Sequence, residues 1–154
     1  MGLIKHKKRN KQIVDFIGLE YGKIHPSDID AVLEVNNQFL FLFEVKLKGT
    51  KFNKGQEILL TNIVDNWDLN SSKDYRWLTH EKKAYAIYCY HNISSTDDDI
   101  LLADCKIVDV YGDGNNYFNI TVKEFIEIKA KEHNIEKLLK NIENKSFIDD
   151  LINI

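Results

Sequence analysis

Hydrophobic residues recur at helical spacing in two parts of the chain, and a capping signal marks a third helix. Near the amino terminus, apolar positions three or four residues apart predict a helix over 13–22, which ends at a glycine. A second stripe is formed by Leu60, Val64 and Trp67. A third helix is predicted over about 121–144, and it opens with the Thr-x-x-Glu spacing of a capping box. Shorter apolar runs separate these three segments.

The shorter apolar runs predict the strands of a sheet. The first two, over 29–35 and 39–47, are separated by a polar three-residue turn, and the second is rich in phenylalanine. Two more, over 84–90 and 100–111, lie on either side of an acidic loop. The order of helix, two or three strands, helix, two strands and helix predicts an α/β fold with a mixed central sheet flanked by helices.

Length and composition narrow the class of protein. The chain has 154 residues, of which 44% are hydrophobic and 29% charged, and this balance predicts one domain over 1–154 with its core at about 10–112. No apolar run approaches the ~20 residues of a membrane helix, and the amino terminus lacks the pattern of a secretory signal. Cys89 and Cys105 have no metal-binding spacing, so a reducing, cytoplasmic location is expected.

Charge is distributed unevenly along the chain. The net charge is −3, yet the first twelve residues contain five basic side chains and no acid. These basic residues are Lys5, Lys7, Lys8, Arg9 and Lys11. A basic segment on an acidic body can bind phosphate groups, because the local field matters more than the net charge. A solvated charged terminus explains this segment equally well.

A Glu/Asp-x-Lys pattern occurs five times, and its surroundings select one occurrence. The five pairs are Glu44/Lys46, Glu81/Lys83, Asp104/Lys106, Glu127/Lys129 and Glu143/Lys145. Side chains two positions apart share a face of a strand but diverge on a helix, which excludes the last two pairs. Glu81 lies in polar surroundings, and Asp104 shares a strand face with its lysine but has no acid opposite on a partner strand. Glu44 and Lys46 complete a run that is apolar on both faces, where unpaired charges are costly.

The apolar pattern also selects how the first two strands pair. If residues 36–38 form the turn, apolar residues oppose one another on a single face. These pairs are Leu33 with Phe41, Ala31 with Phe43 and Ile29 with Val45. On the other face Asp30 then lies opposite Glu44, whereas a shift by one residue would place Asp30 among the phenylalanines. Glu34, opposite Leu40, is a misfit that its position near the turn makes tolerable.

Two opposed carboxylates on neighbouring strands repel each other unless a cation lies between them. Oxygen ligands of this kind suit Mg²⁺ or Mn²⁺. Lys46 lies one pleat beyond Glu44 on the same face, so its ammonium would stand beside the metal. There it could orient a water or stabilise charge that develops on a phosphate. A structural charge cluster, with Lys46 as the counter-ion, is the alternative interpretation.

At this point the chain resembles a known superfamily. Asp30, followed after a hairpin by Phe-Glu-Val-Lys, is similar to the signature of the PD-(D/E)xK nucleases, which share the restriction-endonuclease-like fold and include Holliday-junction resolvases and many phage and repair nucleases. The resemblance covers about 10–90. It implies an αβββαβ core and a metal-dependent phosphodiesterase, with Asp30 and Glu44 as metal ligands and Lys46 as the catalytic lysine.

Two further residues match positions that many members of this superfamily use. Gln56 lies near the start of the helix after the lysine strand, where a glutamine is frequent, and Glu20 lies on the first helix, where a glutamate is frequent. Each has a structural alternative. Asn53 and Gln56 also have the spacing of a helix cap with a reciprocal partner. Glu20 faces inward with its apolar neighbours but could reach solvent at the helix end.

The chain departs from the superfamily pattern at one point. No Pro-Asp pair is present, because residues 26–30 read Pro-Ser-Asp-Ile-Asp. Either Asp28 or Asp30 could therefore be the first ligand. The strand register favours Asp30, since Asp28 would lie a full pleat beyond Glu44. Asp28 or Glu20 could join a second metal ion.

These residues lead to a hypothesis of a magnesium-dependent endonuclease, acting on DNA rather than RNA. Lys48, Lys51 and Lys54 would line the mouth of the cleft and bind phosphates with the basic segment, although a solvated loop is an equal alternative. A homodimer is conceivable, and the lysine-rich composition suggests a low-GC bacterium or phage. A catalytically silent module of the same fold that binds nucleic acid or protein, and an unrelated α/β interaction protein, are the rival hypotheses.

Overall fold

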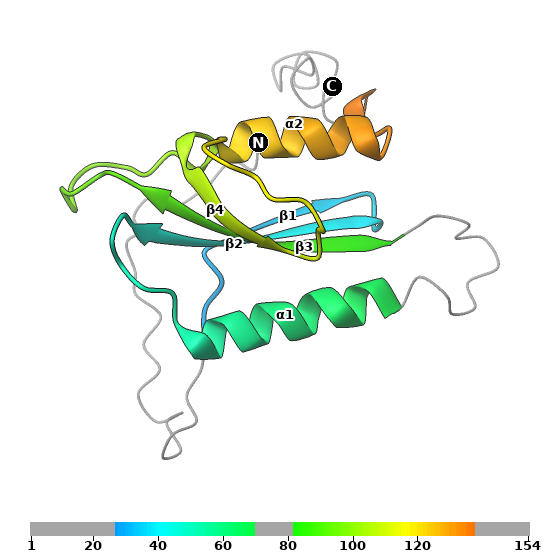
Figure 1. Cartoon of the computed structure of the whole chain (residues 1–154), viewed down its shortest axis with the longest axis horizontal. Coiled ribbons are helices and arrows are strands. Elements are labelled where there is room, and N and C mark those ends of the chain that lie inside the picture. Colours follow the sequence, from blue (N-terminus) through cyan, green and yellow to red (C-terminus); the bar gives the residue numbers. More distant parts are fainter. Residues whose placement is uncertain (1–26, 70–81, 138–154) are drawn as a thin grey trace, which may run out of the picture. The chain divides into compact units, whose positions relative to one another are not determined.

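The computed structural model describes residues 27–69 and 82–137 (Figure 1). These residues belong to two compact units, one spanning Asp28–Ile126 and another that includes the chain from Glu127 onward. The predicted helix over 13–22 lies outside the described residues. A single domain over 1–154 therefore stays a prediction.

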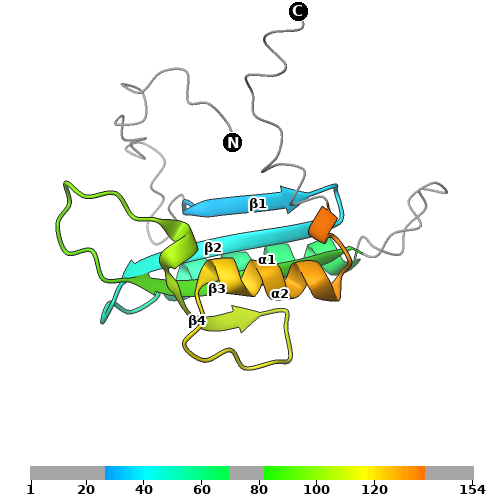
Figure 2. The same ribbon diagram turned by 90° about the horizontal axis from the view of Figure 1, so that it is seen from above.

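The unit Asp28–Ile126 is built on a four-stranded mixed sheet. Its strands are β1 (Ala31–Val35), β2 (Phe39–Leu47), β3 (Lys83–His91) and β4 (Lys106–Tyr111), in that spatial order (Figure 2). The pairs β1–β2 and β3–β4 are antiparallel, whereas β2 and β3 are parallel and α1 (Lys54–Leu69) lies between them in sequence. The predicted α/β class and mixed sheet are confirmed. Among the described residues two strands precede α1, not the three of an αβββαβ order.

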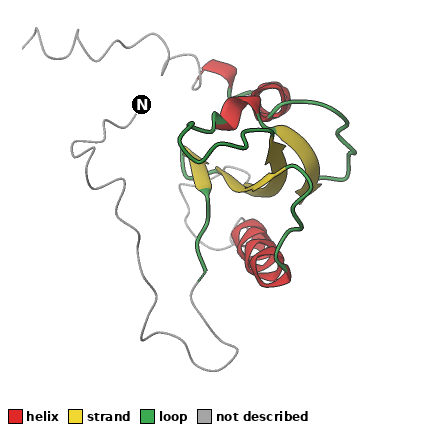
Figure 3. Ribbon diagram, turned by 90° about the vertical axis from the view of Figure 1, so that its left-hand side faces the viewer, coloured by secondary structure: helices red, strands yellow, loops and turns green. Residues whose placement is uncertain are grey.

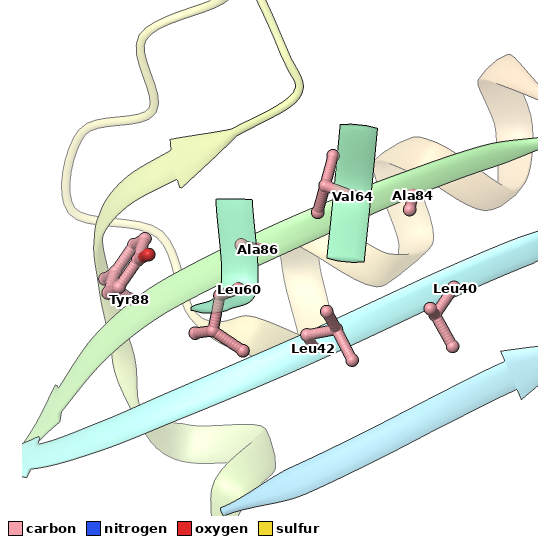
Figure 4. Close-up of a cluster of buried hydrophobic side chains, with 7 residues drawn as sticks. All are labelled: Leu40, Leu42, Leu60, Val64, Ala84, Ala86 and Tyr88. Atoms are coloured by element: carbon pink, nitrogen blue, oxygen red, sulfur yellow. The ribbon is translucent and has the colours of Figure 1, made fainter. Parts of the chain in front are cut away.

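The helix α1 covers one face of the sheet (Figure 3). The side chains packed between them are mostly small and aliphatic. The cluster consists of Leu40, Leu42, Leu60, Val64, Ala84, Ala86 and Tyr88 (Figure 4). The predicted stripe on α1 is confirmed, because Leu60 and Val64 are buried and Trp67 packs against the cluster. Ala84 and Ala86 of β3 are fully buried in this cluster.

The other face of the sheet is aromatic. Phe41 stacks on Tyr85 with ring centroids 5.5 Å apart, and Phe125, at the beginning of α2 (Val122–Glu132), meets both rings edge-on. Burial of β2 on both faces was predicted from its continuous apolar run. The carboxylate of Glu44 therefore lies in a strand that has little contact with solvent.

The β1–β2 hairpin has the predicted register from Ala31 opposite Phe43 to Val35 opposite Phe39. Asn36 and Asn37 adopt left-handed φ angles of 53° and 55°, which asparagine tolerates better than most residues. The Glu34 side chain accepts a hydrogen bond from the backbone amide of Asn37. Glu34, which the sequence predicted as a polar misfit opposite Leu40, thus has a structural role, because its carboxylate closes the turn.

The predicted beginning of the fourth strand was wrong. The strand expected over 100–111 begins only at Lys106, and a short 3-10 helix, η3 (Leu102–Asp104), occupies the preceding residues. Asp104 therefore lies outside β4 and does not share a strand face with Lys106. The sequence of this region is apolar enough for a strand, but Cys105 and Asp104 instead donate backbone hydrogen bonds to carbonyls three residues earlier.

The helix α2 begins as predicted and ends early. Thr121 and Glu124 form a reciprocal capping box, with distances of 2.7 Å and 3.1 Å, and these hydrogen bonds lower the pKa of Glu124. The helix was expected to continue to about 144. It stops at Glu132 because Asn134 adopts a φ of 57° and the amide of Ile135 bonds back to the Ala130 carbonyl.

Two further findings bear on the class of protein. Within the described ranges, no helix is long and apolar enough to cross a membrane. Cys89 and Cys105 are free, buried thiols, and burial raises the pKa of Cys89 to about 12.

Among the described glycines, Gly112 is the one whose surroundings leave no room for a side chain. Its φ is +95°, and an added Cβ would lie 2.7 Å from the Ala84 carbonyl oxygen and 3.2 Å from Val64 Cγ1. We expect Gly112→Ala to lower the free energy of unfolding by about 3 kcal/mol, because backbone strain and a backbone clash combine. Gly49→Ala is the matched control, since Gly49 has a φ of +92° and no atom within 4 Å. Urea unfolding should show a loss of about 1 kcal/mol there. Equal losses at the two sites would contradict this explanation.

Candidate active site

The predicted site residues gather where two parallel strands end. Glu44 and Lys46 occupy the last part of β2, beside the carboxyl end of β3. Asp30 immediately precedes β1, and Gln56 lies in the first turn of α1. The crevice beyond the carboxyl ends of parallel strands is where open α/β sheets generally bind ligands.

Glu44 is the buried acid of this group. Its side chain is 1% exposed, and Oε1 forms an ion pair at 2.5 Å with Nζ of Lys46, which is 25% exposed. Neither carboxylate oxygen accepts a hydrogen bond of normal geometry from any described residue. The ion pair therefore leaves Oε2 without a partner among these residues, which is unusual for a carboxylate out of contact with water.

The surroundings shift the pKa of both partners. Burial raises the pKa of Glu44; its ion pair with Lys46 opposes this effect, and the negative charges of Asp30 and Asp28 add to it. Burial alone would lower the pKa of Lys46, but pairing with Glu44 and the same two aspartates outweigh that effect, and the pKa is raised. Lys46 is therefore an ammonium at neutral pH.

Asp30 reaches β2 through its side chain. Its Oδ2 accepts a hydrogen bond at 2.7 Å from the backbone amide of Val45, the residue that follows Glu44. The backbone ladder ends one residue later, at Ala31, so the predicted pairs Asp30–Glu44 and Ile29–Val45 do not form. At this point a hydrogen bond to the Asp30 side chain replaces the backbone hydrogen bonds between β1 and β2.

The early end of the ladder also changes the position of Ile29. The sequence placed Ile29 on the phenylalanine face, but it packs instead against the cluster that includes Leu40 and Leu42. The chain turns out of the strand at Asp30, which lies in a bend. The two-residue period that predicts facing therefore no longer applies before Ala31.

Gln56 contacts the second candidate acid. Its Nε2 lies 3.5 Å from Oδ1 of Asp28, at the long end of hydrogen-bonding distance. The cap of α1 is made by Asn53 alone, whose Oδ1 accepts a bond at 2.8 Å from the amide of Gly55. Gln56 is therefore directed toward the acids rather than engaged in the cap.

The loop between β2 and α1 holds the predicted phosphate-binding lysines. Lys48 and Lys51 are exposed. Lys54 is 79% exposed and pairs at 3.1 Å with Glu57 in the next turn. Lys48 and Lys51 can be approached by a polyanion, whereas Lys54 shares its charge with an acid.

Aromatic contacts fix this loop on β3. The ring of Phe52 stacks on Tyr90 with centroids 5.1 Å apart and meets Tyr88 edge-on at 5.2 Å. The Tyr90 hydroxyl donates a hydrogen bond at 3.0 Å to the Thr50 carbonyl. The loop thus has a defined position beside the acids.

Sequence reasoning missed Tyr88 as a member of the site. Tyr88 lies directly opposite Glu44 in the parallel register, is 5% exposed, and its hydroxyl has no hydrogen-bond partner among the described residues. Burial, with the negative charges of Glu57, Asp109 and Glu44, raises the pKa of Tyr88 to about 12. The only sequence signal was a tyrosine in a buried strand, which is typical of a sheet core.

Several predicted site residues lie outside the described residues. These are Glu20, Lys7, Lys8 and Arg9. Across the described part of the chain, no group of three or more His, Cys, Asp and Glu side chains is arranged to hold a metal ion. A cation at this site would therefore use two acids, backbone atoms or water.

The donor set is nevertheless chemically suited to a hard divalent cation. Its acids are carboxylates, and the orphaned Oε2 of the buried Glu44 is the type of oxygen that Mg²⁺ and Mn²⁺ prefer. No sulfur or imidazole group takes part.

Comparison of the chain with protein-family models, curated proteins and solved structures found no match.

Proposed function

We propose that the protein is a metal-dependent nuclease that hydrolyses phosphodiester bonds in DNA and is related to the PD-(D/E)xK superfamily, with its restriction-endonuclease-like fold. The observation that carries the proposal is the buried, incompletely paired carboxylate of Glu44, which has Lys46 in contact and Asp30 on the adjacent amide. Mg²⁺ or Mn²⁺ is the proposed cofactor.

The energetics of the acid support a ligand at this site. A carboxylate that is 1% exposed loses most of its hydration, and one lysine that is itself a quarter exposed does not satisfy both oxygens. A purely structural role would favour an apolar side chain, as at Leu40 and Leu42 on the same face. A divalent cation would compensate both the burial of Glu44 and its repulsion by the aspartates.

Each residue has a role that follows from its position. Glu44 and Asp30 would hold the cation, while the Val45 amide fixes the orientation of Asp30. A bound cation would polarise the phosphate and lower the pKa of a water. Lys46 would donate hydrogen bonds to the phosphate oxygens as negative charge develops on them. Gln56 would orient Asp28 or a water at the start of α1.

Substrate binding would use the lysines around the site. Lys48 and Lys51 in the β2–α1 loop would supply charge for two phosphates. The amino-terminal Lys7, Lys8 and Arg9, which lie outside the described residues, are proposed to bind nucleic acid as well. DNA is proposed over RNA because of the superfamily resemblance. A second copy of the chain would be needed to contact both strands of a long duplex.

The test is cleavage of linear, branched and single-stranded DNA, and of RNA, with and without Mg²⁺. The wild type should cleave DNA only with the metal, and Asp30→Ala should lose activity. Glu34→Gln is the matched control, since it removes a carboxylate that closes the hairpin turn. Metal-independent cleavage would contradict the proposal. Binding of nucleic acid without cleavage would instead favour the silent module.

A further inference from the structure

The buried side-chain polar atoms without partners in the described structure belong to two residues that are paired across β2 and β3. Buried side-chain oxygens and nitrogens that form no normal hydrogen bond with described residues are the two carboxylate oxygens of Glu44 and the hydroxyl of Tyr88. Glu44 Oε1 has the ion pair with Lys46 described above. The Tyr88 hydroxyl has no such contact. A buried hydroxyl that has left water without a new partner is costly to the fold.

The two residues share one location. Glu44 and Tyr88 are Cα partners on the adjacent parallel strands β2 and β3, so both side chains project from the same face of the sheet. Figure 4 shows Tyr88 at the end of the hydrophobic cluster that lies toward the arrowheads of β2 and β3. The residue with the orphan hydroxyl and the residue with the orphan carboxylate therefore occupy one register position on the same face of the sheet, and the charge of Glu44 is one of those that act on Tyr88.

The ring of Tyr88 is held in place independently of its hydroxyl. It packs in the cluster with Leu42, Leu60 and Ala86, and Phe52 meets it edge-on at 5.2 Å. A phenylalanine would make the same apolar contacts. Packing therefore does not require the hydroxyl of Tyr88. No described residue forms a hydrogen bond with it either.

We propose that Tyr88 is a positioning residue for the metal site, whose hydroxyl accepts a hydrogen bond from a water ligand of the cation held by Glu44. The inference rests on the proposed function. Mg²⁺ and Mn²⁺ keep several waters when few protein ligands are present, and these waters need acceptors in a buried site. A neutral phenol can accept from the water and donate to a carboxylate oxygen at the same time.

The test is calorimetric titration of the full chain with Mn²⁺. We expect Tyr88→Phe to weaken Mn²⁺ binding roughly 10-fold or more, as is usual for groups that support metal ligands. Tyr85→Phe is the matched control, because it removes a hydroxyl from the same strand on the opposite, aromatic face. This control should bind Mn²⁺ as the wild type does.

A second measurement separates this role from a structural one. Without metal, Tyr88→Phe should unfold at the same or a higher temperature than the wild type, because it removes an unsatisfied buried group. With Mn²⁺ bound, water-proton relaxation should show faster exchange of bound water in Tyr88→Phe. Unchanged affinity and exchange in Tyr88→Phe would overturn the role of Tyr88 and leave the nuclease proposal intact. If the wild type does not bind Mn²⁺ at millimolar concentration, or Glu44→Gln binds it equally, both proposals fail.

Discussion

Glu44→Gln is expected to reduce Mg²⁺-dependent DNA cleavage by roughly 10³-fold, equivalent to about 4 kcal/mol of transition-state stabilisation. The substitution keeps the size of the side chain but removes the negative charge of a group that is 1% exposed. An amide oxygen is a weaker ligand for a hard cation than a carboxylate. Initial rates at saturating Mg²⁺ measure the effect, with Mn²⁺ titration to show that the loss is one of metal binding.

Asp104→Asn is the matched control for this variant. Asp104 belongs to another Asp-x-Lys pattern of the sequence, but it lies in η3 and is exposed. Its replacement should leave cleavage within about twofold of the wild type, as expected for a surface change away from the site. If Glu44→Gln retained full activity, the carboxylate would be structural.

The raised pKa of Glu44 adds a pH dependence to metal binding. The cation binds the carboxylate form, so a proton and Mn²⁺ compete for the same group. Because burial raises the pKa of Glu44 above 4.5, protons should still compete at pH values where an exposed glutamate is fully ionised. Affinity for Mn²⁺ should rise about tenfold per pH unit below this pKa and level off above it. Glu44→Gln should show no such rise.

Lys46→Met is expected to lower kcat by roughly 10²- to 10³-fold, the usual cost of losing one charged donor to a developing oxyanion. Metal affinity should be retained or increase, because the ammonium that contacts Glu44 Oε1 at 2.5 Å no longer competes with the cation. This combination distinguishes Lys46 from a metal ligand, whose loss would weaken binding. Single-turnover cleavage and Mn²⁺ calorimetry measure the two quantities separately.

The same variant makes a second prediction for stability. Without metal, Lys46→Met should be less stable, because the buried carboxylate of Glu44 loses its counter-ion. Added Mn²⁺ should therefore raise the melting temperature of Lys46→Met by more than that of the wild type. Lys106→Met is the control, since Lys106 is exposed on β4 and, among the described residues, its Nζ bonds only the Asn119 carbonyl. A kcat equal to that of the wild type in Lys46→Met would remove the lysine from the mechanism.

The parts of the fold that the sequence predicted are those set by local periodicity. The phenylalanines of β2 must share one buried face of the sheet. The register of the β1–β2 hairpin could therefore be predicted from the alternation of apolar and polar residues alone. The stripe of Leu60 and Val64 predicted the inner face of α1 in the same way. The capping box at Thr121 predicted where α2 begins.

The parts that sequence reasoning missed depend on side chains that replace backbone interactions or on nonlocal pairing. Asp30 ends β1 because its carboxylate bonds the Val45 amide, and alternation carries no sign of such an exchange. Asn134 ends α2 in a conformation that glycine adopts more often. Tyr88 is a candidate only because the parallel register of β3 on β2 places it opposite Glu44 on the same face of the sheet.

We propose that Asp30 and Glu44 bind one cation between them. A crystal structure of the wild type soaked in Mn²⁺, with anomalous data, tests it most directly. We expect a peak within about 2.3 Å of an oxygen of each acid, with Lys46 displaced from Glu44 Oε1. A crystal with no peak at millimolar Mn²⁺, or with the ion bound away from Glu44 while its ion pair with Lys46 persists, would contradict it.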